Sequence, residues 1–228
     1  HDLLHRFFDS DVFYSFRKSP IAVISAVTTL VFFLAAGLAP WLAPHNPFDP
    51  ASLDLMDGFS PPVWEVDGVS KFLLGTDDQG RDILSTIMYG SRVSLIVGFS
   101  AVIFSVVLGV GVGLLAGYLG GWIETVVMRL ADVQLAIPAI LVALMIDGIA
   151  RILVPVHMRD VMAIYVLILA IGISDWPRYA RVARGSALVE RSKEYVSAAR
   201  VIGVHPILIM LRHVLPNVLG PILVMATI

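Results

Sequence analysis

Two aspartates, Asp132 and Asp147, lie inside a long apolar stretch, where an ionisable side chain is by default a candidate functional group. A pair of intramembrane aspartates would suit proton transfer or aspartyl protease chemistry. Asp132 follows Arg129 by three residues, a spacing that favours ion pairing on a helix. Asp147 lies beside Gly148 and Arg151 near the other end of the stretch. These neighbours favour structural roles for both aspartates.

Other catalytic patterns are missing from the sequence. A phosphate-binding Walker loop needs glycines followed by Lys-Ser or Lys-Thr, but Lys18, Lys71 and Lys193, the only lysines, have no glycine-rich approach. There is also no His-Glu-x-x-His pair, no Gly-x-Ser-x-Gly elbow and no cysteine. We therefore expect the chain to have no catalytic residue, no metal site and no ATP-hydrolysing site of its own.

A basic segment at residues 177–213 carries the most informative pattern. Arginines recur every three residues at Arg178, Arg181 and Arg184, and apolar positions farther along allow amphipathic helices. Gly203 and Pro206 interrupt this pattern, which predicts a helix, a turn and a second helix. Such a hairpin can bind anionic lipid or fit a groove on a soluble partner, and composition leaves both open.

The elements that position this hairpin must be membrane helices. Hydrophobic residues make up 57% of the 228 residues and charged residues only 15%, and the mean hydropathy is +0.85. Soluble domains are only about 45–50% apolar, so the excess is expected to face lipid. The net charge of −2 gives no reason to expect a nucleic-acid partner.

Spanning helices need about 20 mostly apolar residues. Five stretches qualify as spans, at about 20–43, 91–118, 123–152, 161–176 and from 214 onward. Gly109, Gly113 and Gly117 form a small-residue ridge for close helix packing, and Pro138 predicts a kink in the third span. The chain begins at His1 and stops inside an apolar run, so we expect it to be incomplete at both ends, with the first span a retained helix.

The distribution of charge along the chain predicts its orientation in the membrane. Segment 44–90 has eight acidic residues against one lysine and one arginine, whereas segment 177–213 is basic. The positive-inside rule therefore places residues 1–19 and 177–213 in the cytoplasm and residues 44–90 outside. Four spans between the two basic regions agree with this assignment. Arg151 and Arg159, expected on the outer side, are a local exception.

One spacing in the basic segment resembles a known family. Two alanines, three residues, a glycine, nine residues and then the four residues 213–216, which end in Leu-Pro, match the cytoplasmic EAA loop of binding-protein-dependent ABC importer permeases. Ser197 stands where that family often has Glu, and His213 where it often has Ile. The resemblance implies ATPase-coupling roles for Glu194, Ser197, Ala198, Ala199, Arg200, Gly203, His213, Leu215 and Pro216.

A second stretch resembles one branch of that family. Residues 74–82 and 89–95 are similar to the segment before the second span in the C-type subunit of dipeptide, oligopeptide and nickel importers. Residues 194–200 and 212–217 look like the same branch. The resemblance covers the chain from about residue 17 to its end. Small residues at Ala198 and Ala199 would let a coupling helix approach a partner closely, Gly203 would permit the turn, and Pro216 would start the next span.

The resemblance implies an all-α polytopic transmembrane helix bundle of the type I ABC importer permease fold, with the fifth span cut off and a sixth expected. Residues 1–19 would be cytoplasmic, 20–43 the first transmembrane helix, 44–90 periplasmic, and 91–228 the transmembrane core, with its coupling loop at 177–213. Implied partners are a second permease, two cytoplasmic ATPase subunits that bind ATP-Mg, a periplasmic solute-binding protein and the bacterial inner-membrane bilayer. The chain itself would bind no cofactor, and its substrate-binding residues are not identified.

Several functions remain open at this point. The leading hypothesis is a permease subunit for short peptides; nickel, glutathione, opines or sugar–peptide conjugates are alternative cargoes. An intramembrane enzyme is disfavoured by the missing motifs. A membrane scaffold that uses the basic hairpin only for lipid would bind in a salt-sensitive manner and would not depend on Gly203.

Overall fold

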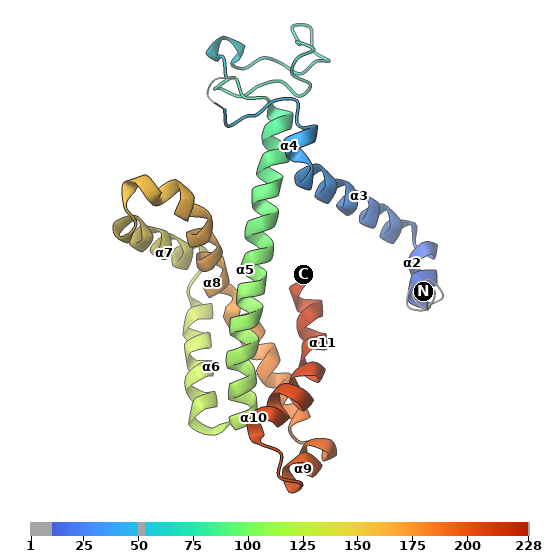
Figure 1. The fold of residues 1–228 in the computed structure, drawn as a ribbon, viewed down its shortest axis with the longest axis vertical. Helices are drawn as coiled ribbons and strands as arrows, with labels where there is room; N and C mark the ends of the chain where they lie inside the picture. Colours follow the sequence, from blue (N-terminus) through green and yellow to red (C-terminus); the bar gives the residue numbers. More distant parts are fainter. Residues whose placement is uncertain (1–10, 50–52, 228) are drawn as a thin grey trace. The chain divides into compact units, whose positions relative to one another are not determined.

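The computed structural model describes residues 11–49 and 53–227, and within them the chain is almost entirely helical (Figure 1). The single β feature of this described part is an isolated bridge between Thr76 and Asp82. The chain divides into two compact units, His1–Leu95 and Ile96–Ile228. Within the described part of the chain, four helices are long and apolar enough to cross a membrane, or five if one bent pair counts as a span.

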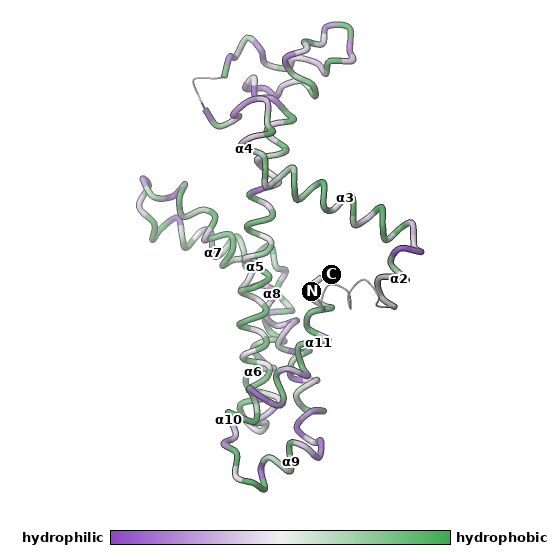
Figure 2. The backbone as a smooth tube through the Cα atoms, turned by 45° about the vertical axis from the view of Figure 1, so that its right-hand side comes forward, coloured by the Kyte–Doolittle hydropathy of each residue, from purple (hydrophilic) through white to green (hydrophobic). Residues whose placement is uncertain are grey.

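The first unit contains the first predicted span. Its helices are α2 (Asp11–Lys18), α3 (Pro20–Gly37), α4 (Ala39–Leu42), the short 3-10 turn η2 (Leu55–Asp57) and the start of α5 (Ile83–Leu119). Ser19 caps α3 by accepting a hydrogen bond from the Ala22 amide at 3.3 Å, and Pro20 occupies the first turn, where its missing N–H costs nothing. Apolar residues follow α3 along its length (Figure 2), as a lipid-facing helix requires.

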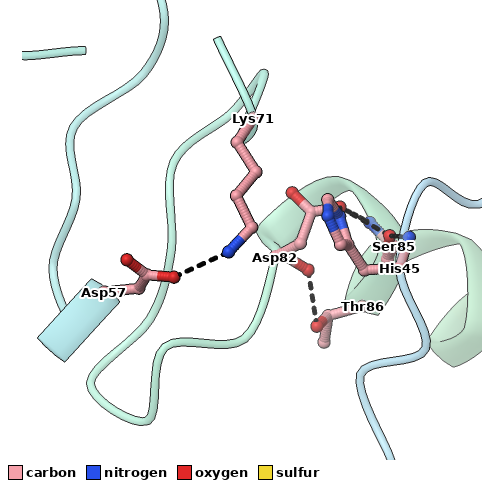
Figure 3. Close-up of polar contacts among 6 residues, drawn as sticks. All are labelled: His45, Asp57, Lys71, Asp82, Ser85 and Thr86. Atoms are coloured by element: carbon pink, nitrogen blue, oxygen red, sulfur yellow. Dashed lines mark hydrogen bonds and ion pairs between the residues drawn. The ribbon is translucent and has the colours of Figure 1, made fainter. Parts of the chain in front are cut away.

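Polar contacts hold the irregular segment between α4 and α5 (Figure 3). Lys71 Nζ lies 2.9 Å from Asp57 Oδ2, and the Asp82 carboxylate accepts from the Ser85 amide at 3.0 Å, which caps the start of α5. Since this cap starts α5 at Ile83, the helix begins eight residues before the predicted start of the second span at residue 91.

The second unit is a helical bundle. Its elements after α5 are α6 (Gly121–Ala136), α7 (Ala139–Leu153), η3 (Val156–Met158), α8 (Arg159–Glu190), α9 (Glu194–Val201), α10 (Pro206–Ile209), the π-helical turn η4 (Met210–Val214) and α11 (Leu215–Ala226). Its buried core is formed by α5, α8, α9, α10, η4 and α11.

The predicted glycine ridge forms the contact between α5 and α8. A Cβ added at Gly109 would lie 2.5 Å from the Trp176 carbonyl oxygen, and one at Gly113 would lie 2.3 Å from the Ala180 carbonyl oxygen. The facing side of α8 carries small residues, including Ala180, which is fully buried. The two backbones therefore touch at a distance that only glycine allows.

Three predicted span limits differ from the structure. The third span is broken into α6 and α7, which meet at 94° around Pro138, so the proline ends a helix rather than kinking it (Figure 1). The fourth continues past Trp176 to Glu190, so the basic segment begins inside α8. The last apolar helix starts at Pro206 rather than near residue 214.

Helix α8 passes through Pro177 because a side chain compensates for it. A proline leaves the carbonyl four residues earlier without its helical partner. That carbonyl belongs to Ile173, and the Gln134 side-chain amide on α6 donates to it. The Gln134 amide oxygen in turn accepts from Trp176 Nε1 at 2.9 Å. One glutamine thus joins α6 to the proline site of α8 and satisfies both groups.

Candidate functional site

The candidate site is the junction between α8 and α11, defined here as residues 190–217, which contains every residue to which the resemblance gives an ATPase-coupling role. The turn that opens it is fixed to the end of α5. Arg191 Nη1 donates to the Gly117 carbonyl at 2.9 Å and to the Tyr118 carbonyl at 3.3 Å, which satisfies acceptors that a helix end leaves free. These two hydrogen bonds therefore hold the start of the junction against the end of α5.

Gly203 ends α9 in a left-handed conformation, as its position in the sequence predicted. Its φ is +82°, a region that side-chain-bearing residues rarely adopt. The Val204 amide donates to the Ala199 carbonyl and the Gly203 amide to the Arg200 carbonyl, both at 3.0 Å. This paired pattern is the Schellman motif, which closes a helix tightly. The turn after α9 is thus well defined.

The two alanines of the motif face opposite ways. Ala199 is 5% exposed and lies with Val196 in the apolar core formed with η4 and α11, whereas Ala198 is exposed. The expectation that both alanines allow close approach to a partner therefore needs correction, because the small size of Ala199 serves packing within the chain. Of the pair, Ala198 is available to another protein.

The remaining motif residues divide between the surface and the start of α11. Glu194, Ser197 and Arg200 are exposed on α9. The Arg200 guanidinium lies 5.5 Å from the centre of the Tyr118 ring, a cation–π arrangement. Pro216 lies in the first turn of α11, directly after Leu215, as predicted.

The tip of the junction is apolar. Val201 is 86% exposed and Ile202 77% exposed, and Ile207 on the next helix is also exposed. Apolar side chains that the chain leaves uncovered mark contact surfaces for protein or lipid. The junction therefore combines a fixed backbone with an exposed apolar end.

Polar contacts also fix the first turn of α9. The Tyr195 hydroxyl lies between the Glu190 carboxylate and the Asn217 amide, and Lys193 Nζ donates to Glu190 Oε1 at 2.6 Å. The hydrogen bond to Glu190 raises the pKa of Lys193. Burial and the bond to Glu190 raise the pKa of Tyr195, so its hydroxyl remains protonated. Sequence reasoning missed Tyr195 and Asn217 as a pair because 22 residues separate them.

The arginines that precede the junction form ion pairs with α6. Arg181 Nη2 lies 2.7 Å from Asp132 Oδ1, and Arg184 pairs with Glu124. The prediction that Asp132 pairs with Arg129 is therefore wrong. Both pairs line a hollow of about 290 Å³. Asp147 does contact its sequence neighbour, with Arg151 Nε 2.7 Å from Asp147 Oδ2.

The first unit holds a second polar cluster, formed by His45, Asp82 and Ser85 (Figure 3). These residue types can form a nucleophilic triad, which needs the imidazole on the serine hydroxyl. Here the Ser85 hydroxyl donates to Asp82 and accepts from the His45 backbone amide at 3.1 Å, while His45 Nδ1 lies 3.7 Å from Asp82 Oδ2. Among the described residues, no hydrogen bond joins the imidazole to Ser85. The arrangement caps a helix and does not activate a nucleophile.

A metal site is likewise not evident: within residues 11–49 and 53–227, no three His, Asp or Glu side chains come together in a way that could hold an ion.

Comparisons with known proteins match most of the chain. A family model described as "Binding-protein-dependent transport system inner membrane component" matches residues 109–228, and one described as "N-terminal TM domain of oligopeptide transport permease C" matches residues 8–62. The dipeptide transport system permease protein DppC of Haemophilus influenzae is 36% identical over 217 residues, which are 95% of this chain and 69% of the relative.

Two further relatives are similar at the same level. The di/tripeptide transport system permease protein DppC of Pseudomonas aeruginosa is 36% identical over 94% of this chain and 66% of its own length. The dipeptide transport system permease protein DppC of Escherichia coli is 36% identical over 93% of this chain and 67% of its own length. The chain thus spans about two thirds of the length of these relatives.

Proposed function

The chain belongs to the inner-membrane permeases of binding-protein-dependent transport systems, and we propose that it is one permease subunit of an ATP-driven importer of short peptides. The cargo is proposed from the relatives, whose names specify dipeptides and di/tripeptides. The match of residues 8–62 to the N-terminal domain of oligopeptide permease C supports the same branch. A second permease completes the translocation path.

The observation that carries this proposal is the geometry of the junction. A short helix transmits a push only if its own chain holds it rigidly. Helix α9 is closed by the Schellman turn at Gly203 and buries Val196 and Ala199 in the core. It leaves Ala198 and the apolar tip exposed. We assign this exposed face to a groove on a cytoplasmic ATPase subunit.

The proposed mechanism converts a rigid-body movement into helix movement. Two partner ATPase subunits bind and hydrolyse ATP-Mg and close on each other, which displaces α9. Helices α8 and α11 then move with α9 because they share its core. The break at Pro138 and the close contact between α5 and α8 allow segments of the bundle to shift as units.

The proposed orientation follows the charges. The junction and residues 1–19 face the cytoplasm, and the polar segment before α5 faces the periplasm, where its acidic residues meet a solute-binding protein. Positive charge near the junction, from Arg191 and Lys193, agrees with the positive-inside rule.

The test is a bulky substitution on the exposed side of α9 in the full-length subunit, reconstituted with its partner permease, ATPase subunits and binding protein. Ala198→Trp is expected to lower ATPase binding and peptide-stimulated ATP hydrolysis by at least tenfold, or about 1.4 kcal/mol, because the new side chain fills the contact surface. Ser70→Trp, at an exposed position in the polar segment before α5, is the control and leaves ATPase binding unchanged. Normal ATPase binding by Ala198→Trp would refute the assignment of this surface.

A further inference from the structure

The hydroxyl of Tyr195 lies where three parts of the junction meet. It donates to Glu190 at the end of α8 and accepts from Asn217 Nδ2 on α11 at 3.1 Å. Asn217 Nδ2 also donates to the His213 carbonyl at 2.9 Å, and this carbonyl lies 3.3 Å from the same hydroxyl. One side chain on α9 thus connects the helix before it with the helix after it.

The connection is made at the weakest point of the following helix. Residues Met210–Val214 form a π turn, in which the regular hydrogen-bond ladder is interrupted. Pro216 follows at once and supplies no backbone donor to the turn before it. A helix with two such interruptions can bend there and absorb a displacement. Asn217 donates to the His213 carbonyl within this stretch, and the Tyr195 hydroxyl lies beside the same carbonyl.

The carboxylate at the other end of the connection is buried. Glu190 is only 8% exposed, and it accepts hydrogen bonds from both Lys193 and Tyr195. A buried carboxylate stays in place only where hydrogen bonds and charge satisfy it. Glu190 is therefore a fixed anchor for the Tyr195 ring.

The polar contacts complement the apolar ones. Helix α9 has eight residues, too few to be stable alone, so tertiary contacts set its position. Val196 and Ala199 hold one side of it through apolar packing, which resists separation but does not fix direction. Directional hydrogen bonds at Tyr195, in the first turn, fix how α9 is rotated relative to α11.

We propose that Glu190, Tyr195 and Asn217 form a polar clamp that locks α9 to the π turn, so that displacement of α9 moves α11 instead of bending the helix at that turn. Tyr195 is thus a positioning residue for energy coupling. The clamp rests on the proposed function, since it concerns how an ATPase-driven push on α9 reaches the membrane helices.

The experiment uses the complete importer in proteoliposomes and measures peptide transported per ATP hydrolysed. Tyr195→Phe removes the hydroxyl and keeps the ring, and Asn217→Leu removes the amide at similar size. Each is expected to lower transport per ATP by roughly three- to tenfold, the range that the net free energy of one hydrogen bond allows. The double variant is expected to be no worse than either single variant, because all the bonds belong to one network. Tyr165→Phe, at an exposed position on α8, is the control and leaves the ratio unchanged.

A distance measurement separates positioning from folding. These 228 residues contain no cysteine, so cysteines introduced at Ser197 on α9 and Leu223 on α11 carry one pair of spin labels once any cysteines elsewhere in the importer are replaced. The distance distribution is expected to be narrow in the parent importer and broad in the Tyr195→Phe variant, with ATPase subunits bound in both. Parent-like distances and transport ratios in Tyr195→Phe would overturn the clamp. Loss of assembly in both single variants would also overturn it, because the network would then serve folding. A parent importer that binds no ATPase would instead refute the proposed function.

Discussion

Gly113 on α5 and its neighbour on the opposite face, Gly111, make a matched pair for testing how the bundle is packed. A Cβ at Gly113 would lie 2.3 Å from the Ala180 carbonyl oxygen and 2.7 Å from the Ala180 Cα, whereas a Cβ at Gly111 would meet nothing within 4 Å. The obstruction at Gly113 is backbone, so no side-chain rotation relieves it. Substitution there must push α5 and α8 apart.

The expected magnitude follows from two terms. Glycine to alanine in a helix interior is favourable by about 0.5–1 kcal/mol, and this gain is common to both positions. Overpacking a closely packed contact costs about 1–3 kcal/mol, and separated helices also lose dispersion contacts. We therefore expect Gly111→Ala to be neutral or slightly stabilising, and Gly113→Ala to be less stable than Gly111→Ala by about 1–3 kcal/mol.

The assay is unfolding of the purified subunit in mixed micelles by titration with sodium dodecyl sulfate, followed by circular dichroism and by tryptophan fluorescence. Trp176 contributes to the fluorescence signal and lies beside the contact, where its carbonyl oxygen meets Gly109. Equal stability of the two alanine variants, or a more stable Gly113→Ala, would refute the close approach of α5 and α8.

Two further predictions concern polar contacts. Gln134→Leu leaves the Ile173 carbonyl and the Trp176 indole without partners, so it is expected to cost about 1–3 kcal/mol of unfolding free energy in the same titration; a cost below about 0.5 kcal/mol would contradict the bridging role. For Asp77, burial disfavours the charged form, but hydrogen bonds from Arg81 and Gln79 outweigh it and lower its pKa below the usual 3.8. Its stabilisation is therefore fully present above the unfolded pKa of about 3.8 and is lost as the pH falls through the lower folded pKa. Thermal unfolding from pH 6 to pH 3 should show a smaller loss of stability for Asp77→Asn than for the parent chain, and equal losses would contradict this.

Features set by local sequence were predictable. The four-residue spacing from Gly109 to Gly117 predicted a small-residue contact, and the structure places α8 against it. Gly203 predicted a tight turn, which has a positive φ. Pro216 predicted the first turn of a helix. In each case the backbone conformation or the size of one residue type decides the local structure, so the prediction needs no information about distant parts of the chain.

Features set by distant residues were not predictable. Asp132 pairs with Arg181, 49 residues away, and no periodicity in either helix marks that contact. The end of the fourth span was placed at Trp176 because charge begins there, but charge marks where lipid ends and not where a helix ends. Pro177 is tolerated within α8 because Gln134, on another helix, donates to the Ile173 carbonyl that the proline leaves without a helical donor. The burial of Ala199 likewise depends on tertiary packing, which the sequence pattern does not reveal.

We propose that this permease couples peptide movement to ATP hydrolysis by its partners through the junction. The most direct test is peptide-dependent ATP hydrolysis and uptake by the full-length subunit, reconstituted with its partner permease, ATPase subunits and binding protein, across di- and tripeptides, nickel and glutathione. Di- or tripeptides are expected to stimulate both activities, and Ala198→Trp is expected to lower the stimulation at least tenfold. Stimulation by nickel or glutathione alone would contradict the proposed cargo, and a complex that assembles no ATPase would contradict the claim itself.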